Sequence, residues 1–225
     1  MLRQDELTKS LTWQDGLTAG LDEVGRGCLA GPVVAAAVIW PTAATLEGLT
    51  DSKKLSAKKR ELLACAIREQ AIAWSIGLVG QKTIDKINIL QASLLAMAMA
   101  VGRLKTTPSK LIIDGTALIP LPVLSKFWRR HHEDTPLPRE EAVIKADLSV
   151  PAVSAASILA KTYRDNLMQT LDVRWPLYGF AKHVGYGSAH HRAMLKKYGP
   201  CPLHRLSFRG VRQEEQVQRQ GSLLG

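Results

Sequence analysis

The sequence predicts an α/β protein with a mixed β-sheet flanked by helices. Short apolar runs bounded by Gly and Pro indicate strands, and longer segments with apolar residues three and four positions apart indicate helices. The two kinds of segment alternate along the chain, which is typical of an α/β fold. With 225 residues, 46% of them hydrophobic, the chain is long enough to form a sizeable core.

Three strands and two helices are expected in the first half of the chain. The Gly- and Pro-rich segment 25–32 supplies the turn between the first two strands. Ser56 precedes the first helix as its N-cap, and mixed three- and four-residue apolar spacing indicates the second. The expected elements are strands over 16–24, 33–40 and 72–79 and helices over 57–70 and 83–103.

The second half is expected to add two short strands and two helices. The stretch 116–141 contains several prolines, a His-His pair and alternating charges, which indicates an inserted surface loop or hairpin. Residues 174–210 are rich in Gly, Pro, His and Tyr, and predict a smaller helical C-terminal region. The expected elements are strands over 111–113 and 142–144 and helices over 151–171 and 188–197.

Composition limits the class of protein. We expect a leader at 1–16, one domain over 17–210 and a tail at 211–225. The three cysteines lack paired spacing, which argues against a disulfide framework. The N-terminus has no apolar signal core and no run reaches membrane-spanning length, so a cytoplasmic protein without a membrane partner is expected. No repeat or coiled-coil pattern occurs, and we expect a monomer. The net charge of +10 favours an anionic partner such as a nucleic acid.

Four acidic residues stand at ends of expected strands or beside helix starts: Asp22, Glu23, Asp114 and Asp147. Strand ends on one edge of a sheet converge, so we expect these carboxylates in a common pocket. Grouped carboxylates resist burial unless a cation compensates them, and Mg²⁺ and Mn²⁺ select carboxylate oxygens. Such a set can hold two divalent ions about 4 Å apart for hydrolysis of a phosphodiester.

Two other interpretations of these acids stay open. Neighbouring residues of a strand point to opposite faces, so Asp22 and Glu23 share a site only if the strand bends or ends there. Alternatively, Asp22 and Glu23 are exposed turn residues and Asp114 is a turn former.

A Gly-Arg-Gly sequence follows the first two acids directly. Gly25 and Gly27 let the backbone approach another molecule closely, and Arg26 can meet a phosphate. A metal site beside a phosphate contact suggests phosphodiester chemistry.

The segment 22–33 (DEVGRGCLAGPV) resembles the signature of type 2 ribonuclease H, the bacterial ribonuclease HII group. The resemblance covers about residues 18–208 and rests on several motifs in the same order. The further motifs are 51–55 (DSKKL), 87–92 (INILQA), 113–115 (IDG), 154–161 (SAASILAK), 164–165 (RD), 178–180 (YGF), 183–187 (HVGYG) and 204–208 (HRLSF).

The resemblance implies a ribonuclease H-like fold and a metal-dependent endonuclease. Its substrates would be RNA–DNA hybrids and duplex DNA with single embedded ribonucleotides. Cleavage would fall 5′ of the ribonucleotide and leave a 3′-hydroxyl and a 5′-phosphate, with Mn²⁺ or Mg²⁺ as cofactor. The four acids would be the catalytic metal ligands, and the cellular roles would be ribonucleotide excision and hybrid removal.

The resemblance also assigns contacts with nucleic acid. The Gly25–Arg26–Gly27 turn and Tyr186 would read the ribose 2′-hydroxyl, with the tyrosine stacking on the following sugar. Tyr186 could instead be a packed core aromatic. The remaining candidates are Lys53, Lys54 and Lys161 for phosphates and Asn88 and Gln91 for the minor groove. Alternatively, the lysines are ordinary surface charges, and Asn88 and Gln91 cap a helix or pack against it.

The chain departs from the family pattern around the fourth acid. Ala146 stands where the family usually has Gly, and residues 151–153 replace its alanine-rich lead into the helix. The separation of Asp114 from Asp147 is also unusually long. Competitors for the fourth ligand are Glu140, Glu141 and Asp165.

Rival functions differ in their requirements. Another nuclease or transposase of the same broad fold would share the acids without needing the Gly-Arg-Gly turn, and a non-catalytic nucleic-acid-binding protein would tolerate their loss. A zinc site is a further alternative, although the spacing is not typical; its residues would be His183, His190, His191, Cys201 and His204. Residues 221–225 suggest a docking tail for a partner such as a sliding clamp.

Overall fold

A computed structural model describes residues 16–42, 44, 46–49 and 55–212. The chain forms two compact units that interleave along the sequence. The first unit comprises the chain up to Val24 together with Val34–Leu78 and Leu94–Thr162. The second comprises Gly25–Val33, Val79–Ser93 and the chain from Tyr163 onward. The expected C-terminal region therefore belongs to a unit that also includes two earlier segments.

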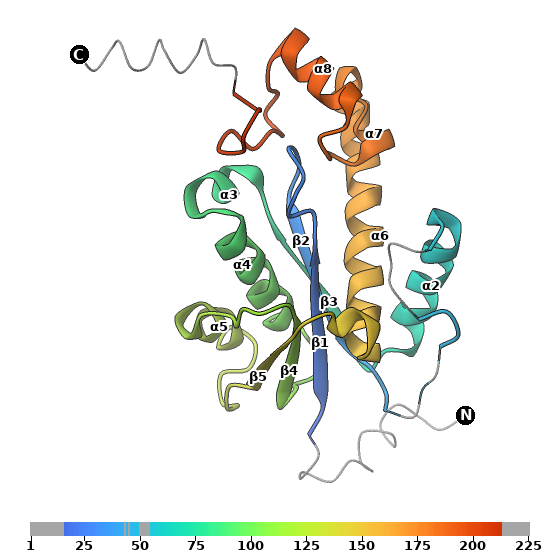
Figure 1. Ribbon diagram of the computed structural model, residues 1–225. Coiled ribbons are helices and arrows are strands. Elements are labelled where there is room, and N and C mark those ends of the chain that lie inside the picture. The colour runs from blue at the N-terminus through green and yellow to red at the C-terminus, as the bar shows by residue number, and fades with distance from the viewer. Residues whose placement is uncertain (1–15, 43, 45, 50–54, 213–225) are drawn as a thin grey trace, which may run out of the picture. The chain divides into compact units, whose positions relative to one another are not determined.

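A five-stranded mixed sheet forms the centre of the first unit, in the order β3-β2-β1-β4-β5 (Figure 1). β1 is antiparallel to β2 and parallel to β4, and β4 is parallel to β5. The predicted α/β class with a mixed sheet is confirmed. The strands are β1 (Thr18–Val24), β2 (Val33–Ile39), β3 (Ala73–Val79), β4 (Lys110–Asp114) and β5 (Arg139–Val143).

Helices cover both faces of this sheet. Figure 1 shows α2 (Ala57–Gln70) and α6 (Pro151–Arg174) along one face and α4 (Ile89–Val101) and α5 (Leu121–Trp128) along the other. Small apolar residues of β2 and of α6 pack with α2 in the core between sheet and helices. α2 begins and ends as predicted, and at its start the Ser56 hydroxyl accepts a hydrogen bond from the Lys59 N–H.

A glycine allows α6 to lie directly on β1. A Cβ atom at Gly20 would clash with the backbone of Ala152 and Val153 in the first turn of α6. Gly20 lies two residues before Asp22, on the same face of the strand. The close approach therefore places α6 beside the first predicted catalytic acid.

We expect Gly20→Ala to lower the free energy of unfolding by at least about 2 kcal/mol, because the methyl group must displace helix backbone. Gly80→Ala is the matched control, since a Cβ there meets no atom within 4 Å. Gly80 is the N-cap of the helix Gln81–Ile87, where Ala is less favourable than Gly, so this variant should lose less than about 1 kcal/mol. Urea titration of both variants measures the difference, and equal stability would contradict the close contact.

The helix expected over 83–103 is two helices. α3 (Gln81–Ile87) ends at Asn88, which has a φ of 66°, and α4 begins at the next residue. The Asn88 side-chain oxygen accepts a hydrogen bond from the Gln91 N–H at 3.1 Å. Residues other than glycine rarely adopt this backbone conformation, and the Asn88 side chain caps the new helix, so apolar spacing alone misses the break.

The stretch expected as an inserted loop or hairpin over 116–141 is more ordered than predicted. It contains α5, with a proline in its first turn, where proline is tolerated, and its last residues belong to β5. Trp128 is buried and its indole N–H donates to the Thr135 carbonyl at 3.1 Å. This segment is therefore a packed part of the first unit.

The second unit has a small core of its own. Its buried members include Met168, Tyr178 and Phe180. The predicted helix over 188–197 is confirmed as α8 (Ala189–Tyr198), with Ser188 as its N-cap, and two shorter helices precede it, η3 (Pro176–Tyr178) and α7 (Phe180–His183). None of the helices that the structure describes combines the length and the apolar character needed to cross a bilayer.

Candidate active site

Asp22 and Asp114 lie side by side at the carboxyl ends of two parallel strands. Leu21 of β1 is paired in register with Ile113 of β4, so the next residue of each strand is an aspartate on the same face. Asp22 is 8% exposed. Neighbouring parallel strands thus supply a close pair of carboxyl groups, Asp22 buried and Asp114 partly exposed.

The electrostatics of Asp22 show that its negative charge is uncompensated. Burial raises the pKa of Asp22 from 3.8 to about 7, and the nearby carboxylates of Glu23 and Asp114 contribute to the increase. A hydrogen bond from the Ser157 hydroxyl opposes the shift without cancelling it. A cation in this position would remove the unfavourable charge.

Asp147 lies on the segment that adjoins Asp114. The Asp114 carboxylate accepts a hydrogen bond from the Ala146 N–H at 2.8 Å. The short 3-10 helix η2 (Ala146–Leu148) carries Asp147, which is 8% exposed. The Asp147 carbonyl accepts a hydrogen bond from the Ser154 hydroxyl at 2.6 Å, which anchors this turn to the first turn of α6.

Glu23 occupies a different position from the other three acids. The pairing of β1 with β2 continues through Glu23 and Val24, so the strand stays regular past Asp22. Alternation along the strand directs consecutive side chains to opposite faces. Glu23 is nonetheless near enough to raise the pKa of Asp22.

The competing acids are engaged elsewhere. Glu140 accepts a hydrogen bond from the Ile119 N–H at 2.9 Å, and burial raises its pKa. Glu141 forms a 2.7 Å ion pair with Lys110. Asp165 lies near enough to Tyr186, within the second unit, to affect the pKa of that tyrosine. These placements favour Asp147 over its competitors.

The acids of the first unit have the right chemistry for a hard divalent cation. Within the described part of the chain, no three or more His, Cys, Asp or Glu side chains form a group that could hold a metal ion. Mg²⁺, however, is commonly held by one or two carboxylates together with waters and substrate phosphate oxygens. Asp22, with its raised pKa, and the neighbouring Asp114 fit that mode of binding, and the joint role of all four acids stays a prediction.

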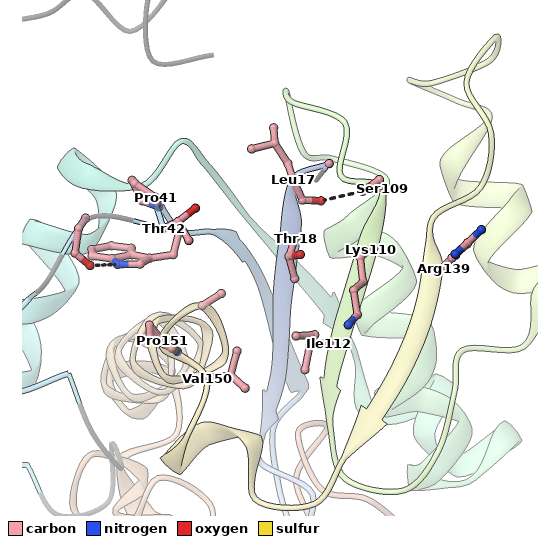
Figure 2. A pocket seen from close by; sticks show the side chains of 14 residues that line it. Leu17, Thr18, Pro41, Thr42, Ser109, Lys110, Ile112, Arg139, Val150 and Pro151 are labelled. Carbon is pink, nitrogen blue, oxygen red and sulfur yellow. Dashed lines mark hydrogen bonds between the residues drawn. The ribbon is translucent and has the colours of Figure 1, made fainter. Parts of the chain in front are cut away.

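The cavity shown in Figure 2, about 1070 Å³ in volume, is a different feature of the first unit. It lies at the beginnings of β1 and β4, where Thr18 and Lys110 line it, whereas the acids stand at the ends of these strands. None of the described residues that line it is an Asp, Glu, His or Cys. These lining residues therefore offer none of the groups that the predicted chemistry needs.

Two buried arginines hold the Gly-Arg-Gly loop within the second unit. Arg205 is fully buried and donates to the carbonyl oxygens of Arg26 and Gly31, each at 2.9 Å. Arg164 is also fully buried and donates to the carbonyl oxygens of Pro32 at 3.0 Å and Ala30 at 3.2 Å. The loop backbone is thus fixed by guanidinium groups from two later parts of the chain.

The two glycines of the loop serve different purposes. Gly25 has a φ of 93°, and a Cβ there would clash with the Arg164 side chain. A Cβ at Gly27 would meet no atom within 4 Å, and Gly27 is exposed. Gly25 is therefore needed for folding of the loop, whereas open space surrounds Gly27.

Tyr186 stands on an adjoining loop of the second unit. The Leu29 N–H donates to the Gly185 carbonyl at 2.9 Å, which joins this loop to the one that carries Gly27. Tyr186 is 43% exposed, and its hydroxyl lies within hydrogen-bonding range of the Cys28 thiol. Its position suits a side chain available to a ligand better than a packed core aromatic.

The structure says less about the other predicted contacts with nucleic acid. Lys53 and Lys54 lie outside the described residues. Lys161 is partly exposed on α6 in the first unit. Asn88 and Gln91 are both exposed in the second unit, and the Asn88 side chain caps α4, as one of the alternatives anticipated.

The family profile described as Ribonuclease HII matches residues 19–211. The chain belongs to the ribonuclease HII family. It is 55% identical to the ribonuclease HII of Nitratidesulfovibrio vulgaris over 205 residues, which are 91% of each protein.

Solved structures agree with this family. The crystal structure of ribonuclease H2 from Pyrococcus horikoshii matches with a TM-score of 0.72 and 26% identity, over 90% of this chain and 99% of that one. The ribonuclease HII in the PCNA:RNase HII complex from Archaeoglobus fulgidus matches with a TM-score of 0.66 and 30% identity, over 88% and 97%. The fold is therefore ribonuclease H-like, and the ribonuclease HII family assigns the chain a metal-dependent hydrolysis of RNA in RNA–DNA hybrids.

Sequence reasoning did not assign the roles of three residues that support the predicted site residues. In the first unit Ser157 contacts Asp22. In the second unit Arg164 and Arg205 hold the loop. Ser157 and Arg164 are seven residues apart and so lie on one face of α6. The signal available in the sequence was Arg164, a charged residue on a helix face whose other side chains are small and apolar.

The histidines and cysteine considered as a zinc site do not form one. His191 and His204 are buried and hydrogen-bonded to each other through their Nε2 atoms at 3.0 Å. Their ring nitrogens are therefore used within the protein.

Proposed function

We propose that this ribonuclease HII, in addition to acting on RNA–DNA hybrids, nicks duplex DNA at a single embedded ribonucleotide. Cleavage falls on the 5′ side of the ribonucleotide and leaves a 3′-hydroxyl and a 5′-phosphate. The observation that carries the proposal is the pairing of the buried Asp22 with Asp114 at the ends of two parallel strands, with the loop of the exposed Gly27 following Asp22 in the chain.

Asp22, Glu23, Asp114 and Asp147 would hold two divalent ions, Mg²⁺ or Mn²⁺. When bound, such a pair of ions activates water as the nucleophile and stabilises the leaving oxygen. Asp22 and Asp114 supply closely spaced oxygen donors, and Ser157 orients Asp22 by its hydrogen bond. The Ala146 N–H orients the Asp114 carboxylate in the same way.

The loop of the second unit would recognise the sugar. An RNA-containing duplex differs from DNA in its 2′-hydroxyl groups, which hydrogen-bonding groups of a protein backbone can read. Gly25, Arg26 and Gly27 provide such a backbone, and the absence of a side chain at Gly27 leaves room for close approach. The exposed ring of Tyr186 would stack on the neighbouring sugar.

Incubation of a labelled DNA duplex carrying one ribonucleotide with Mg²⁺ or Mn²⁺ tests the proposal. We expect a single product cut 5′ of the ribonucleotide, a 3′-hydroxyl that a polymerase extends directly, and no cut in the all-DNA duplex. Cleavage of the all-DNA duplex would favour a nuclease or transposase of the same broad fold. Cleavage of a continuous hybrid but not of the single-ribonucleotide duplex would contradict the proposal.

Gly27→Ala should separate substrate recognition from folding. Because open space surrounds the position, we expect the melting temperature to stay within about 2 °C of the wild type. We expect kcat/KM for the single-ribonucleotide duplex to fall at least about tenfold, since the methyl group would stand between backbone and sugar. Full activity with unchanged stability would remove Gly27 from the recognition site.

A sliding clamp is a further proposed partner, since the similar protein from Archaeoglobus fulgidus was solved in a PCNA:RNase HII complex. The tail 221–225, proposed as the docking segment, lies outside the described residues. Loss of clamp binding when residues 221–225 are deleted, measured by gel filtration, would support this assignment.

A further inference from the structure

Two buried histidines of the second unit link the backbone of Tyr186 to that of Cys201. His191 is fully buried and His204 is 2% exposed. Their Nε2 atoms are 3.0 Å apart. The Nδ1 atom of His191 lies 2.8 Å from the Tyr186 carbonyl oxygen, and the Nδ1 atom of His204 lies 2.9 Å from the Cys201 backbone nitrogen. We call this chain of hydrogen bonds the His191–His204 relay.

The partners at its two ends fix the protons of the relay. A carbonyl oxygen only accepts, so Nδ1 of His191 must donate to Tyr186, and Nε2 of a neutral His191 must accept. His204 must then donate from Nε2, which leaves its Nδ1 to accept the Cys201 N–H. Every ring carries one proton and every nitrogen has a partner of the opposite kind.

A second proton would disrupt this arrangement. Proton donation from His204 Nδ1 is available only toward the Cys201 carbonyl oxygen at 3.2 Å, and it would leave the Cys201 N–H without its acceptor. Burial is the main cause that lowers the pKa of both rings to about 4. His183, which stacks on His191, and the nearby His190 and Arg192 lower the pKa of His191 further. The relay is therefore neutral at physiological pH.

At its Tyr186 end the relay holds a loop whose backbone conformation is unfavourable. Val184 has a φ of 43° and a ψ of 36°, a left-handed conformation that β-branched residues rarely adopt. The Arg164 guanidinium holds the Val184 carbonyl at 2.8 Å. The Tyr186 N–H donates to the His183 carbonyl at 2.8 Å, and the Gly185 N–H donates to Nδ1 of His183 at 3.2 Å. Hydrogen bonds to His183, His191 and Arg164 thus keep the strained loop in place.

We propose that His191 and His204 are positioning residues that orient Tyr186 toward the ribonucleotide through its carbonyl oxygen. The inference rests on the proposed role of Tyr186 in recognition. It assigns His191 one tautomer, with the proton on Nδ1, and it makes the geometry of the tyrosine depend on a residue that touches no substrate. His204 acts only by fixing that tautomer.

A pair of variants tests which nitrogen of His191 matters. In His191→Asn the side-chain amide replaces Nδ1 and can still donate to the Tyr186 carbonyl. In His191→Gln the amide reaches the position of Nε2 and loses that donor. For a duplex with one ribonucleotide, we expect kcat to fall about tenfold in His191→Gln, as for the loss of one hydrogen bond of about 1.4 kcal/mol. His191→Asn should stay within about threefold of the wild type, and KM should change little in either.

Imidazole ¹⁵N NMR of the wild-type protein tests the relay without any variant. We expect His191 to be protonated at Nδ1 and His204 at Nε2 near pH 7. The opposite tautomer of His191 would overturn the relay whatever the kinetics. Equal losses of kcat in His191→Asn and His191→Gln, together with equal losses of melting temperature, would reduce His191 to a packing role and overturn the proposal.

Tyr186→Ala, measured in parallel, separates this inference from the proposed function. If Tyr186→Ala cleaves the single-ribonucleotide duplex with wild-type kcat and KM, the role of Tyr186 is wrong and the positioning role fails with it. If Tyr186→Ala is impaired while His191→Gln is not, recognition by Tyr186 stands and only the positioning role is wrong.

Discussion

Asp22→Asn and Asp114→Asn should each lower the rate of cleavage at least about a thousandfold, equivalent to about 4 kcal/mol. Each substitution replaces a carboxylate oxygen of the close pair by an amide nitrogen, which does not ligate a hard cation. The amide has nearly the same shape, so the fold and the binding of the duplex should persist. Single-turnover cleavage and filter binding on the same single-ribonucleotide duplex measure the two properties separately.

Glu141→Gln is the matched control for these variants. Glu141 lies on the adjacent strand β5, and its carboxylate forms an ion pair with Lys110 rather than facing another acid. We expect near wild-type cleavage from it. Retained cleavage in Asp114→Asn, or its loss in Glu141→Gln, would contradict the placement of the site at the ends of β1 and β4.

Asp22→Asn should also stabilise the protein in the absence of divalent metal. The pKa of Asp22 is about 7 in the folded state, against 3.8 ordinarily, so the folded protein binds this proton more tightly than the unfolded chain does. Stability therefore falls as the pH rises from about 4 to about 7, and the whole cost is present above pH 7. The shift of about three pH units corresponds to at most about 4 kcal/mol.

Urea unfolding with a chelator at pH 5 and pH 8 tests this prediction. The free energy of unfolding that Asp22→Asn gains over the wild type should be larger at pH 8 than at pH 5. In the folded wild type the Asp22 carboxyl group is mostly protonated at pH 5 and mostly charged at pH 8. Added Mn²⁺ should stabilise the wild type and leave the variant nearly unchanged. A variant less stable than the wild type at pH 8 would show that the charge of Asp22 is already compensated within the protein.

The sequence predicts most of the first unit because its elements follow local rules. α2 is predicted to the residue, since Ser56 is a strong N-cap. The strands are apolar and lie between Gly and Pro, so β1, β2 and β4 are found within one or two residues. Carboxyl ends of parallel strands converge, which is why Asp22 and Asp114 could be paired in advance.

Backbone conformations and tertiary contacts account for what the sequence does not predict. The break at Asn88 depends on a backbone conformation rather than on apolar spacing. Trp128 makes α5 part of the core, although the prolines around it suggest a loop. The hydrogen bonds of Arg164 and Arg205 to the segment 25–33 join residues more than 130 positions apart, and no local pattern announces them.

The peptide plane between Arg26 and Gly27 has a direction that follows from the buried Arg205. In a trans peptide the carbonyl and the amide N–H point in opposite directions, and no cis peptide occurs among the described residues. Arg205 holds the Arg26 carbonyl from within the protein, so the Gly27 N–H is turned outward. A ribose 2′-oxygen can accept from that N–H, whereas a deoxyribose offers only carbon-bound hydrogen. In the proposed recognition of the ribose, a guanidinium that no solvent reaches would thereby help to determine which sugar the loop accepts.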